Sequence, residues 1–522
     1  MIGRQTTTWF WLGVGLVAAY GWWTLPVVNH PLGSDWGHYF TAAEYIWDPV
    51  DGIAYPDFRK PWFGWLIGGL GQAMGYLDAA QWVSRMSMLV MVASAAGLGW
   101  ALSNRWCGLV AAAAVPLMPL VMDGALWVNH YPLLSAAVGM AFAAGSAAVR
   151  WRQTGWFLLA GLSAGAAWAL DMRGGIALAG ASALVVLAAL RCTPRAAAAR
   201  LMVFGAAVAM ILAHAAWLER AFDVPQLAFE QQLEVQRKGT LEQIRQGLFD
   251  DRQLQEACAN ETVGRFTIGA SATACGEALR LASYRRLSAL QLLPLPATLA
   301  AMGVMLVPYR RKRNGLGQLA VSTAAAAVVL GAPAVSLWAG MGWVTYFDRY
   351  VMPFAVLFAA AVPIAAGRVV SWIPRCPAWL GAVGALVWVI RSDPGLDARS
   401  LDSPELAQSS EYHAGEFARW AAESVGPDDR VLDCAGLAVD SLLLPNRIDY
   451  TRFPPGDPEC VSRLRAPDRT RGTLFLITMH RDIPPHLSAR DLPFNADAVR
   501  RQGYEPVEHD LTLDGYRLWR RR

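Results

Sequence analysis

Charged residues are scarce in this sequence. Only 16% of its 522 residues are Asp, Glu, Lys or Arg, whereas 55% are hydrophobic and 23 are tryptophans. Soluble domains usually carry about 25% charged residues, so this composition excludes an ordinary soluble protein. Long apolar runs separated by short polar stretches predict a mainly α-helical, polytopic membrane protein instead.

The sequence also lacks the ligand spacing of a metal-binding domain and the internal repeats that are typical of transporters. The seven cysteines include no Cys-x-x-Cys pair, and the eight histidines are scattered. No internal repeat is visible, and the charges gather at the ends of the apolar runs, whereas transporters often combine internal repeats with broken, charge-bearing helices. Chemistry is therefore expected at the ends of the predicted helices.

We expect about eleven membrane-spanning helices, each nearly long enough to cross about 30 Å of hydrocarbon at about 1.5 Å per residue. The first is expected to be a retained signal anchor, because its apolar run is long and lacks a small-residue cleavage site. The predicted spans are 9–28, 84–103, 107–123, 131–149, 155–171, 174–190, 199–218, 286–308, 317–340, 350–367 and 377–391.

Lys and Arg are distributed unequally between the short loops on the two sides. One set of loops holds most of them, including the run from Arg310 to Arg313, and the positive-inside rule assigns this set and the N-terminus to the cytoplasm. The loops 29–83 and 219–285 then face outside. If Trp62 to Tyr76 were another span, every later loop would change sides and the run from Arg310 to Arg313 would lie outside. This segment is therefore predicted to be a juxtamembrane or re-entrant helix on the outer face. We expect a multi-pass protein of a bacterial inner (plasma) membrane.

The cysteines fit this topology. Cys258, Cys275, Cys434 and Cys460 fall in outer segments, which predicts two disulfides there, paired by proximity in sequence. The remaining three cysteines fall at cytoplasmic helix ends and are expected to be reduced thiols.

The chain after residue 391 changes character and predicts a small extracytoplasmic α/β domain over 392–522, following a membrane domain over 1–391. Strands are expected at 430–434 and 473–479, with one or two more between 503 and 519, and helices at 411–424 and 437–444. This region has no glycine-rich phosphate loop and no nucleophile constellation, so a structural or acceptor-recognition role is favoured. The outer loop 219–285 fits either a solvated helical hairpin or an acceptor-binding flap.

The outer stretch from Gly33 to Phe63 concentrates charge beside the membrane. It holds Asp35, His38, Asp48, Asp51, Tyr55, Arg59 and Lys60 among its polar residues. Charge in such a place is costly unless it is solvated or paired, so the stretch is a candidate site. A solvated loop is the alternative for any single residue.

Several segments on the predicted outer side resemble the GT-C membrane glycosyltransferases, in particular the bacterial branch related to protein O-mannosyltransferases and to aminoarabinose transferases of lipid A. The similarity rests on an early loop Asp, on the order Tyr55-Pro56…Lys60-Pro61-Trp62 followed by Arg85, and on the segment YFDRYVMP at 346–353. The segments His130-Tyr131-Pro132 and DMRGG at 171–175 occupy similar places.

This resemblance implies a GT-C-like fold and the transfer of a sugar from a polyprenyl phosphate to an acceptor hydroxyl on the outer face. The matching position for the family's base is Asp35, with a helix N-cap or a substrate-orienting contact as rival roles. The departing lipid phosphate would be held by Arg59, Lys60, Arg85, Arg173 and Arg349. Headgroup anchoring is the alternative for Arg59 and Lys60, and pairing with Asp78 and Asp171 is the alternative for Arg85 and Arg173.

The remaining expectations concern the sugar, the metal and the partners. His38, Tyr55, His130, Tyr131 and Tyr350 are candidates for the sugar or acceptor pocket, although a structural histidine is the simpler reading of His130. A carboxylate next to Asp35 is missing, so a divalent metal is left open, with Asp48 and Asp51 as candidate ligands or as turn residues. Expected partners are the lipid-linked sugar, an acceptor lipid, glycan or protein, and membrane lipids, but no nucleic acid. A flippase of a lipid-linked precursor and a non-catalytic envelope scaffold are the alternatives.

Overall fold

A computed structural model describes somewhat more than half of the chain in separate ranges, and everything below concerns these residues. They are 2–25, 36–47, 60–118, 121–122, 125, 129–224, 303–307, 316–338, 352–377, 379–391, 420–421, 423–426, 428–433, 449–452, 472–479, 496–507 and 516–521. The chain divides into two compact units. The first comprises Met1–Val27, Ala42–Val263 and Ala270–Arg399, and the second comprises Val28–Thr41, Gly264–Gly269 and Ser400–Arg522.

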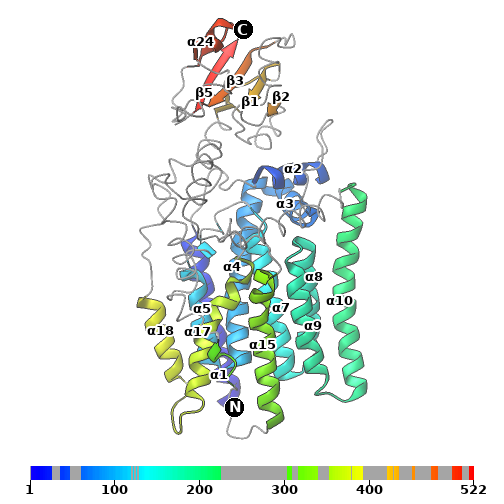
Figure 1. The fold of residues 1–522 in the computed structure, drawn as a ribbon, viewed down its shortest axis with the longest axis vertical. Coiled ribbons are helices and arrows are strands. Elements are labelled where there is room, and N and C mark those ends of the chain that lie inside the picture. Colours follow the sequence, from blue (N-terminus) through cyan, green and yellow to red (C-terminus); the bar gives the residue numbers. More distant parts are fainter. Residues whose placement is uncertain are drawn as a thin grey trace. The chain divides into compact units, whose positions relative to one another are not determined.

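The first unit is a bundle of apolar helices that run up and down beside one another (Figure 1). Four of its helices are long and apolar enough to cross a membrane, namely Tyr76–Leu102, Tyr131–Trp151, Pro194–Ala221 and Met352–Val370. The predicted count of about eleven spans therefore stays a prediction. The helices are α1 (Ile2–Thr24), α4 (Tyr76–Leu102), α5 (Arg105–Ala114), α7 (Tyr131–Trp151), α8 (Thr154–Leu170), α9 (Gly174–Ala189), α10 (Pro194–Ala221), α15 (Leu316–Trp338), α17 (Ala355–Val370) and α18 (Leu380–Arg391).

Several predicted boundaries are wrong, and the reasons are local. α5 ends at Ala114 and continues only as a 3-10 turn, η1 (Val115–Leu117), instead of reaching residue 123. Pro116 explains this end, because it lacks an N–H donor and its ring clashes with the preceding turn of an α-helix. α1, α4 and α10 begin five to eight residues before the expected 9, 84 and 199, because each helix continues from its apolar run into the polar flank. The predicted span 286–308 lies mostly outside the described residues.

Two shorter helices, α2 (Trp36–Trp47) and α3 (Pro61–Met74), lie at the end of the bundle where α4 begins (Figure 1). The helix expected at Trp62 to Tyr76 is thus present as a separate element. α2, whose bounds were not predicted, begins directly after Asp35, for which a helix N-cap was a rival role. Gly75 separates α3 from α4 with a φ of 88°, which an L side chain rarely adopts. α2 is held against α3 by the Trp47 indole, which donates to the Trp65 carbonyl at 2.8 Å.

The loops predicted to be cytoplasmic meet at the opposite end of the bundle. Arg150 donates to the Ser103 carbonyl, and Arg191 donates to the Val149 carbonyl at 2.8 Å. Arg368 is fully buried and donates to backbone oxygens of Leu102, Met305, Val307 and Ser322. The described part of the bundle therefore keeps the two predicted sets of loops apart, while the side facing the cytoplasm stays a prediction.

The second unit holds a five-stranded sheet in the order β2-β1-β3-β5-β4. β1 (Arg430–Asp433) pairs in parallel with β2 (Asp449–Arg452) and β3 (Leu474–Met479), while β5 (Tyr516–Arg521) is antiparallel to β3 and β4 (Glu505–Pro506). Its core contains Leu432, Leu474, Leu476, Val499, Tyr504 and Trp519, with Val499 on the short helix α24 (Ala496–Arg501). The predicted strands at 430–434 and 473–479 are found, whereas β2 was not predicted. The domain boundary at 391/392 stays a prediction.

Candidate functional site

Four helix ends meet at the end of the bundle where α3 lies. They are the N-termini of α3, α7 and α9 and the C-terminus of α8. The chain reverses between α8 and α9 within three residues, with the Gly174 and Gly175 amides donating to the carbonyls of Asp171 and Met172 at 2.9 Å. A Cβ on Gly174 would lie 2.0 Å from the Ala167 carbonyl oxygen, so only glycine fits this tight turn. The turn places Asp171 and Arg173 beside the start of α7.

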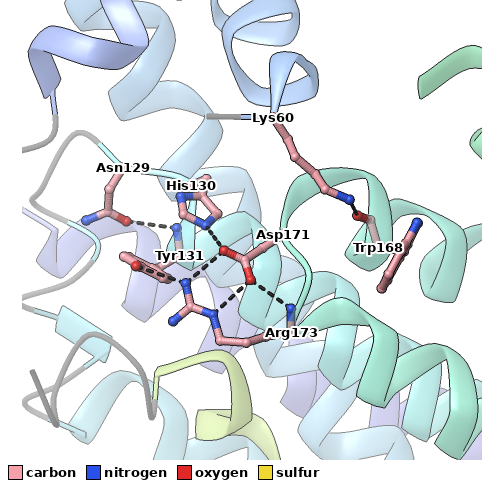
Figure 2. A network of polar contacts seen from close by, with 7 residues as sticks. All are labelled: Lys60, Asn129, His130, Tyr131, Trp168, Asp171 and Arg173. Atoms are coloured by element: carbon pink, nitrogen blue, oxygen red, sulfur yellow. Dashed lines mark hydrogen bonds and ion pairs between the residues drawn. The ribbon is translucent and has the colours of Figure 1, made fainter. Parts of the chain in front are cut away.

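Asp171 is the centre of a polar network (Figure 2). Its Oδ1 accepts the Arg173 backbone N–H and the Arg173 Nε–H, both at 2.8 Å. Its Oδ2 accepts from Arg173 Nη2 at 2.7 Å and contacts His130 Nε2 at 3.0 Å. A carboxylate offers about four lone-pair sites, and these four contacts occupy them. Asp171 is therefore an anchor for its neighbours and is poorly placed to take a proton from a substrate.

The ion pair between Asp171 and Arg173 is almost dry. The two side chains are 13% and 6% exposed. Burial disfavours both charges, but their attraction outweighs it. Together with the Arg173 and His130 hydrogen bonds, that attraction holds the pKa of Asp171 well below its ordinary value and that of Arg173 above its own. Both groups therefore stay charged at neutral pH.

Tyr131 and His130 complete the buried side of the network. The Tyr131 hydroxyl accepts from Arg173 Nη2 at 3.1 Å, and its ring lies 4.9 Å from the guanidinium carbon. Asn129 accepts the Tyr131 backbone N–H at 2.8 Å, which supports the first turn of α7. Because Asp171 is ionised, His130 must direct an N–H at it, so the network also fixes which ring nitrogen carries a proton. His130 thus has a definite orientation at the end of the bundle where α3 lies.

Lys60 approaches the network from α3. Its ammonium donates to the Trp168 carbonyl at 2.6 Å and lies 4.4 Å from the centre of the Trp168 indole. Trp168 stands in the last turn of α8, where a cation complements the negative end of the helix dipole. Burial lowers the pKa of Lys60, while the charges of Glu219 and Asp171 oppose that shift. Lys60 therefore joins α3 to α8 and brings a second cation to this end of the bundle.

Aromatic side chains flank the cation on the α10 side. The Trp62 indole donates to His214 Nδ1 at 2.9 Å, and the Trp65 ring lies 4.8 Å from the His214 ring. The Trp217 ring stacks on the His214 ring with 5.8 Å between their centres, and 57% of this tryptophan is exposed. Tryptophans of α3 and α10 thus form a packed group around His214.

The structure unites four of the predicted site residues and sets one apart. His130, Tyr131 and Arg173 are joined around Asp171, and Lys60 contacts the Trp168 carbonyl three residues before Asp171. The alternative pairing of Arg173 with Asp171 is confirmed. Arg85 lies elsewhere on α4 and donates to the carbonyls of Trp22 and Leu25 at 2.9 and 2.7 Å, at the C-terminus of α1. This contact favours a capping role for Arg85.

Most other predicted site residues lie outside the described residues. They are Asp35, Asp48, Asp51, Tyr55, Arg59, Arg349, Tyr350, Cys258, Cys275, Cys434 and Cys460, and the His38 side chain is also not described. Within the described ranges, no group of three His, Cys, Asp or Glu side chains could hold a metal. Cys107, Cys192 and Cys376 are free thiols, as the topology predicts.

Sequence reasoning missed the central role of Asp171, which it treated only as a partner of Arg173, and the contributions of Asn129 and Trp168. A signal for Asp171 was present in the sequence. Polar residues stand at the junctions 130–131 and 171–174 between apolar runs, and both junctions were assigned to the predicted outer side. The contact between His130 and Asp171 joins residues 41 positions apart, and no local pattern specifies it.

Comparisons with known proteins give weak similarities. No protein-family model matches the chain, and no curated protein is similar to it in sequence. Among solved structures, the chain is similar to the archaeal oligosaccharyltransferase AglB from Archaeoglobus fulgidus in complex with an inhibitory peptide and a dolichol-phosphate. The identity is 11% and the TM-score 0.47, over 90% of this chain and 69% of that one.

ArnT from Cupriavidus metallidurans is similar as well. The form bound to undecaprenyl phosphate is 13% identical with a TM-score of 0.41, over 98% of each chain. The apo form is 14% identical with a TM-score of 0.42, over 99% of this chain and 98% of that one.

Proposed function

We propose that this protein is a membrane glycosyltransferase that moves a monosaccharide from a polyprenyl-phosphate donor to an acceptor hydroxyl at the outer face. The observation that carries the proposal is the hydrogen-bonded group of His130, Asp171 and Arg173 at one end of an apolar bundle, with Lys60 held nearby on the Trp168 carbonyl. Two cations stand there beside one ionised carboxylate. A lipid-linked phosphate placed against the apolar helices would present its negative charge to these cations.

In this proposal the reaction needs a base, a phosphate site and an orienting group. Asp35 takes the proton of the acceptor hydroxyl while the acceptor oxygen forms a bond to the anomeric carbon of the sugar. The bond from that carbon to the phosphate oxygen breaks, and the polyprenyl phosphate leaves with the electron pair. Asp171 is ruled out as the base by its four existing contacts, which supports giving that role to a carboxylate from another segment.

The two cations have different parts. Arg173 is locked by Asp171 and Tyr131, so it provides a fixed positive field and holds His130 through the shared carboxylate. Lys60 sits on a flexible stem at the start of α3, and we assign it to the charge that develops on the departing phosphate. His130 and Tyr131 border the sugar or acceptor.

The test uses the purified full-length protein in detergent with a panel of radiolabelled polyprenyl-phosphate monosaccharides and cell-envelope acceptors. We expect Asp35→Asn to slow release of the label by about 10²- to 10⁴-fold, as for loss of a general base. Lys60→Met should slow it by about 10- to 100-fold, the value of a charge-assisted contact, and Lys60→Arg should recover part of that loss.

Arg220→Met is the matched control, because Arg220 is an exposed cation in the last turn of α10 at the same end of the bundle. Thermal unfolding of each variant separates a loss of chemistry from a loosened α3. Full turnover by a folded Lys60→Met protein would remove Lys60 from the phosphate site. No release of any sugar by the wild type with the complete set of donors and acceptors would contradict the proposed function.

A further inference from the structure

At the end of the bundle opposite the candidate site, three arginines gather where the α7–α8 turn meets the α9–α10 loop. Arg152 Nη1 donates to the Arg191 carbonyl at 3.1 Å. Arg200 Nη1 donates to the sulfur of Cys192, which follows Arg191 in the sequence. The Arg200 guanidinium also lies 5.7 Å from the Phe157 ring in the first turns of α8. We call Arg152, Arg191 and Arg200 the arginine cluster. It draws on three separate elements of the chain.

The cluster gathers three positive charges. Of the residues that the structure describes, no Asp or Glu forms an ion pair with any of these three guanidinium groups. Arg152 and Arg191 are in direct contact through the Arg191 carbonyl. Burial lowers the pKa of Arg191, and the charge of Arg152 adds to that shift while Cys192 opposes it. The N-termini of α8 and α10 lie beside them and add the positive ends of two helix dipoles.

Capping of helix C-termini is the simplest role for these arginines, and it accounts for only part of the arrangement. Arg191 does cap α7 through the Val149 carbonyl, and Arg152 does cap α9 through the Arg191 carbonyl. Each contact uses one of the five N–H donors of a guanidinium. Arg152 also adopts a left-handed backbone with a φ of 57°, where glycine is favoured. An exposed arginine at such a position indicates a use beyond the cap.

Apolar surface adjoins the cluster on its membrane side. Leu190, next to Arg191, is 77% exposed, and Met202, two residues after Arg200, is 68% exposed. The rings of Trp100, Trp151 and Trp156 pack against one another at the same end, and tryptophans mark the depth of lipid headgroups. A ligand bound here would therefore contact the arginine cluster at one end and exposed apolar side chains along the rest of its length.

We infer that the arginine cluster binds the phosphate of an anionic phospholipid, whose acyl chains lie along the exposed apolar faces of α9 and α10. The lipid phosphate would accept hydrogen bonds from the guanidinium N–H groups that do not cap a helix. A zwitterionic lipid would bind less tightly, because the cation in its headgroup is repelled by the arginine cluster. Basic pockets between membrane helices are suited to such headgroups. Figure 1 shows the α9–α10 loop at the end of the bundle away from α3, so this site is separate from the candidate site.

The test measures lipid binding to the purified full-length protein in a neutral detergent by native mass spectrometry, with phosphatidylglycerol and phosphatidylcholine as probes. We expect phosphatidylglycerol to bind at least tenfold more tightly. Arg152→Gly and Arg200→Gln should each weaken its binding by about five- to tenfold, the contribution of one arginine near an anionic headgroup. Arg152→Gly suits the left-handed backbone, so its thermal stability without lipid should be kept.

Arg375→Gln is the matched control, because Arg375 is an exposed arginine with a positive φ of 61° in the turn after α17, at the same end of the bundle. It should leave binding unchanged, and Arg152→Lys should retain most of it. Equal binding of the two lipids, or equal losses in Arg152→Gly and Arg375→Gln, would overturn the inference. Displacement of phosphatidylglycerol by millimolar inorganic phosphate alone would show a site for a soluble anion and would also overturn it.

Discussion

Replacing Asp171 by Asn tests whether the candidate site depends on a buried ion pair. The Arg173 side chain is only 6% exposed, and two of its guanidinium N–H groups donate to the Asp171 carboxylate, together with the Arg173 backbone N–H. At 2.7 Å and an effective dielectric constant of about 20, the gross attraction is roughly 6 kcal/mol. Asn would leave the guanidinium buried without a counter-charge and would turn an amide N–H₂ toward one of its donors. We expect a loss of about 3–5 kcal/mol in the free energy of unfolding.

The assay is equilibrium unfolding of the purified protein in mixed micelles, followed by tryptophan fluorescence. The double variant Asp171→Leu/Arg173→Met removes both charges and fills the space, so it should recover most of the lost stability. Asp78→Asn is the control, because Asp78 is an exposed carboxylate in the first turn of α4. A loss below about 1 kcal/mol in Asp171→Asn, or a double variant as unstable as the single one, would refute this reasoning.

The same pair makes a prediction about pH. The pKa of Asp171 is lower in the folded protein than in the unfolded chain, because Arg173 and His130 favour the carboxylate over the cost of burial. Its stabilisation is therefore complete above the unfolded pKa of about 3.9 and is lost as the pH falls through the folded pKa. The stability gap between wild type and Asp171→Asn should stay constant from about pH 5 to 8 and should narrow only below about pH 4. A gap that closes near pH 6 would contradict the assignment.

Two further changes probe how the bundle is built. Gly174→Ala should destabilise the protein by about 3 kcal/mol in the same unfolding assay, because the new Cβ would collide with the Ala167 backbone; Gly155→Ala, with nothing within 4 Å, should be neutral or mildly stabilising. Arg368→Met should cost more than about 3 kcal/mol, because it leaves the buried carbonyls of Leu102, Val307 and Ser322 without a donor. Arg368→Lys should recover part of that loss, and the same stability in Arg368→Met as in wild type would show that water replaces the guanidinium.

Much of the membrane fold can be predicted because apolar runs and cation placement act over short stretches of sequence. The junctions at 130–131 and 171–174 were assigned to one side, and the structure brings them together around Asp171. The helix α3 was predicted not to be a full span, because one more span there would have moved every later loop to the other side of the membrane. Boundaries were less predictable, because α1, α4 and α10 continue into polar flanks whose helical state depends on packing.

The details of the candidate site could not be predicted from local patterns. The contact of Lys60 with the Trp168 carbonyl joins residues 108 positions apart, and it depends on how α3 packs beside α8. The sequence presented Arg85 and Arg173 as equivalent cations near the outer side. Tertiary packing distinguishes them, since Arg85 meets helix-end carbonyls whereas Arg173 meets a carboxylate.

The two anchors of α3 have a consequence for the loop that precedes it. Trp47 ties the end of α2 to the Trp65 carbonyl, and Lys60 ties the start of α3 to the end of α8. Residues 48–59, which include Asp48, Asp51, Tyr55 and Arg59, lie between these two anchors in the sequence, so the chain is fixed to the bundle on both sides of this segment. Bringing together the ends of a free segment of this length costs roughly 2 kcal/mol. Because folding of the bundle already brings Trp47 and Lys60 together, this closure cost falls on folding and not on the binding of a substrate that contacts Asp48, Asp51, Tyr55 or Arg59.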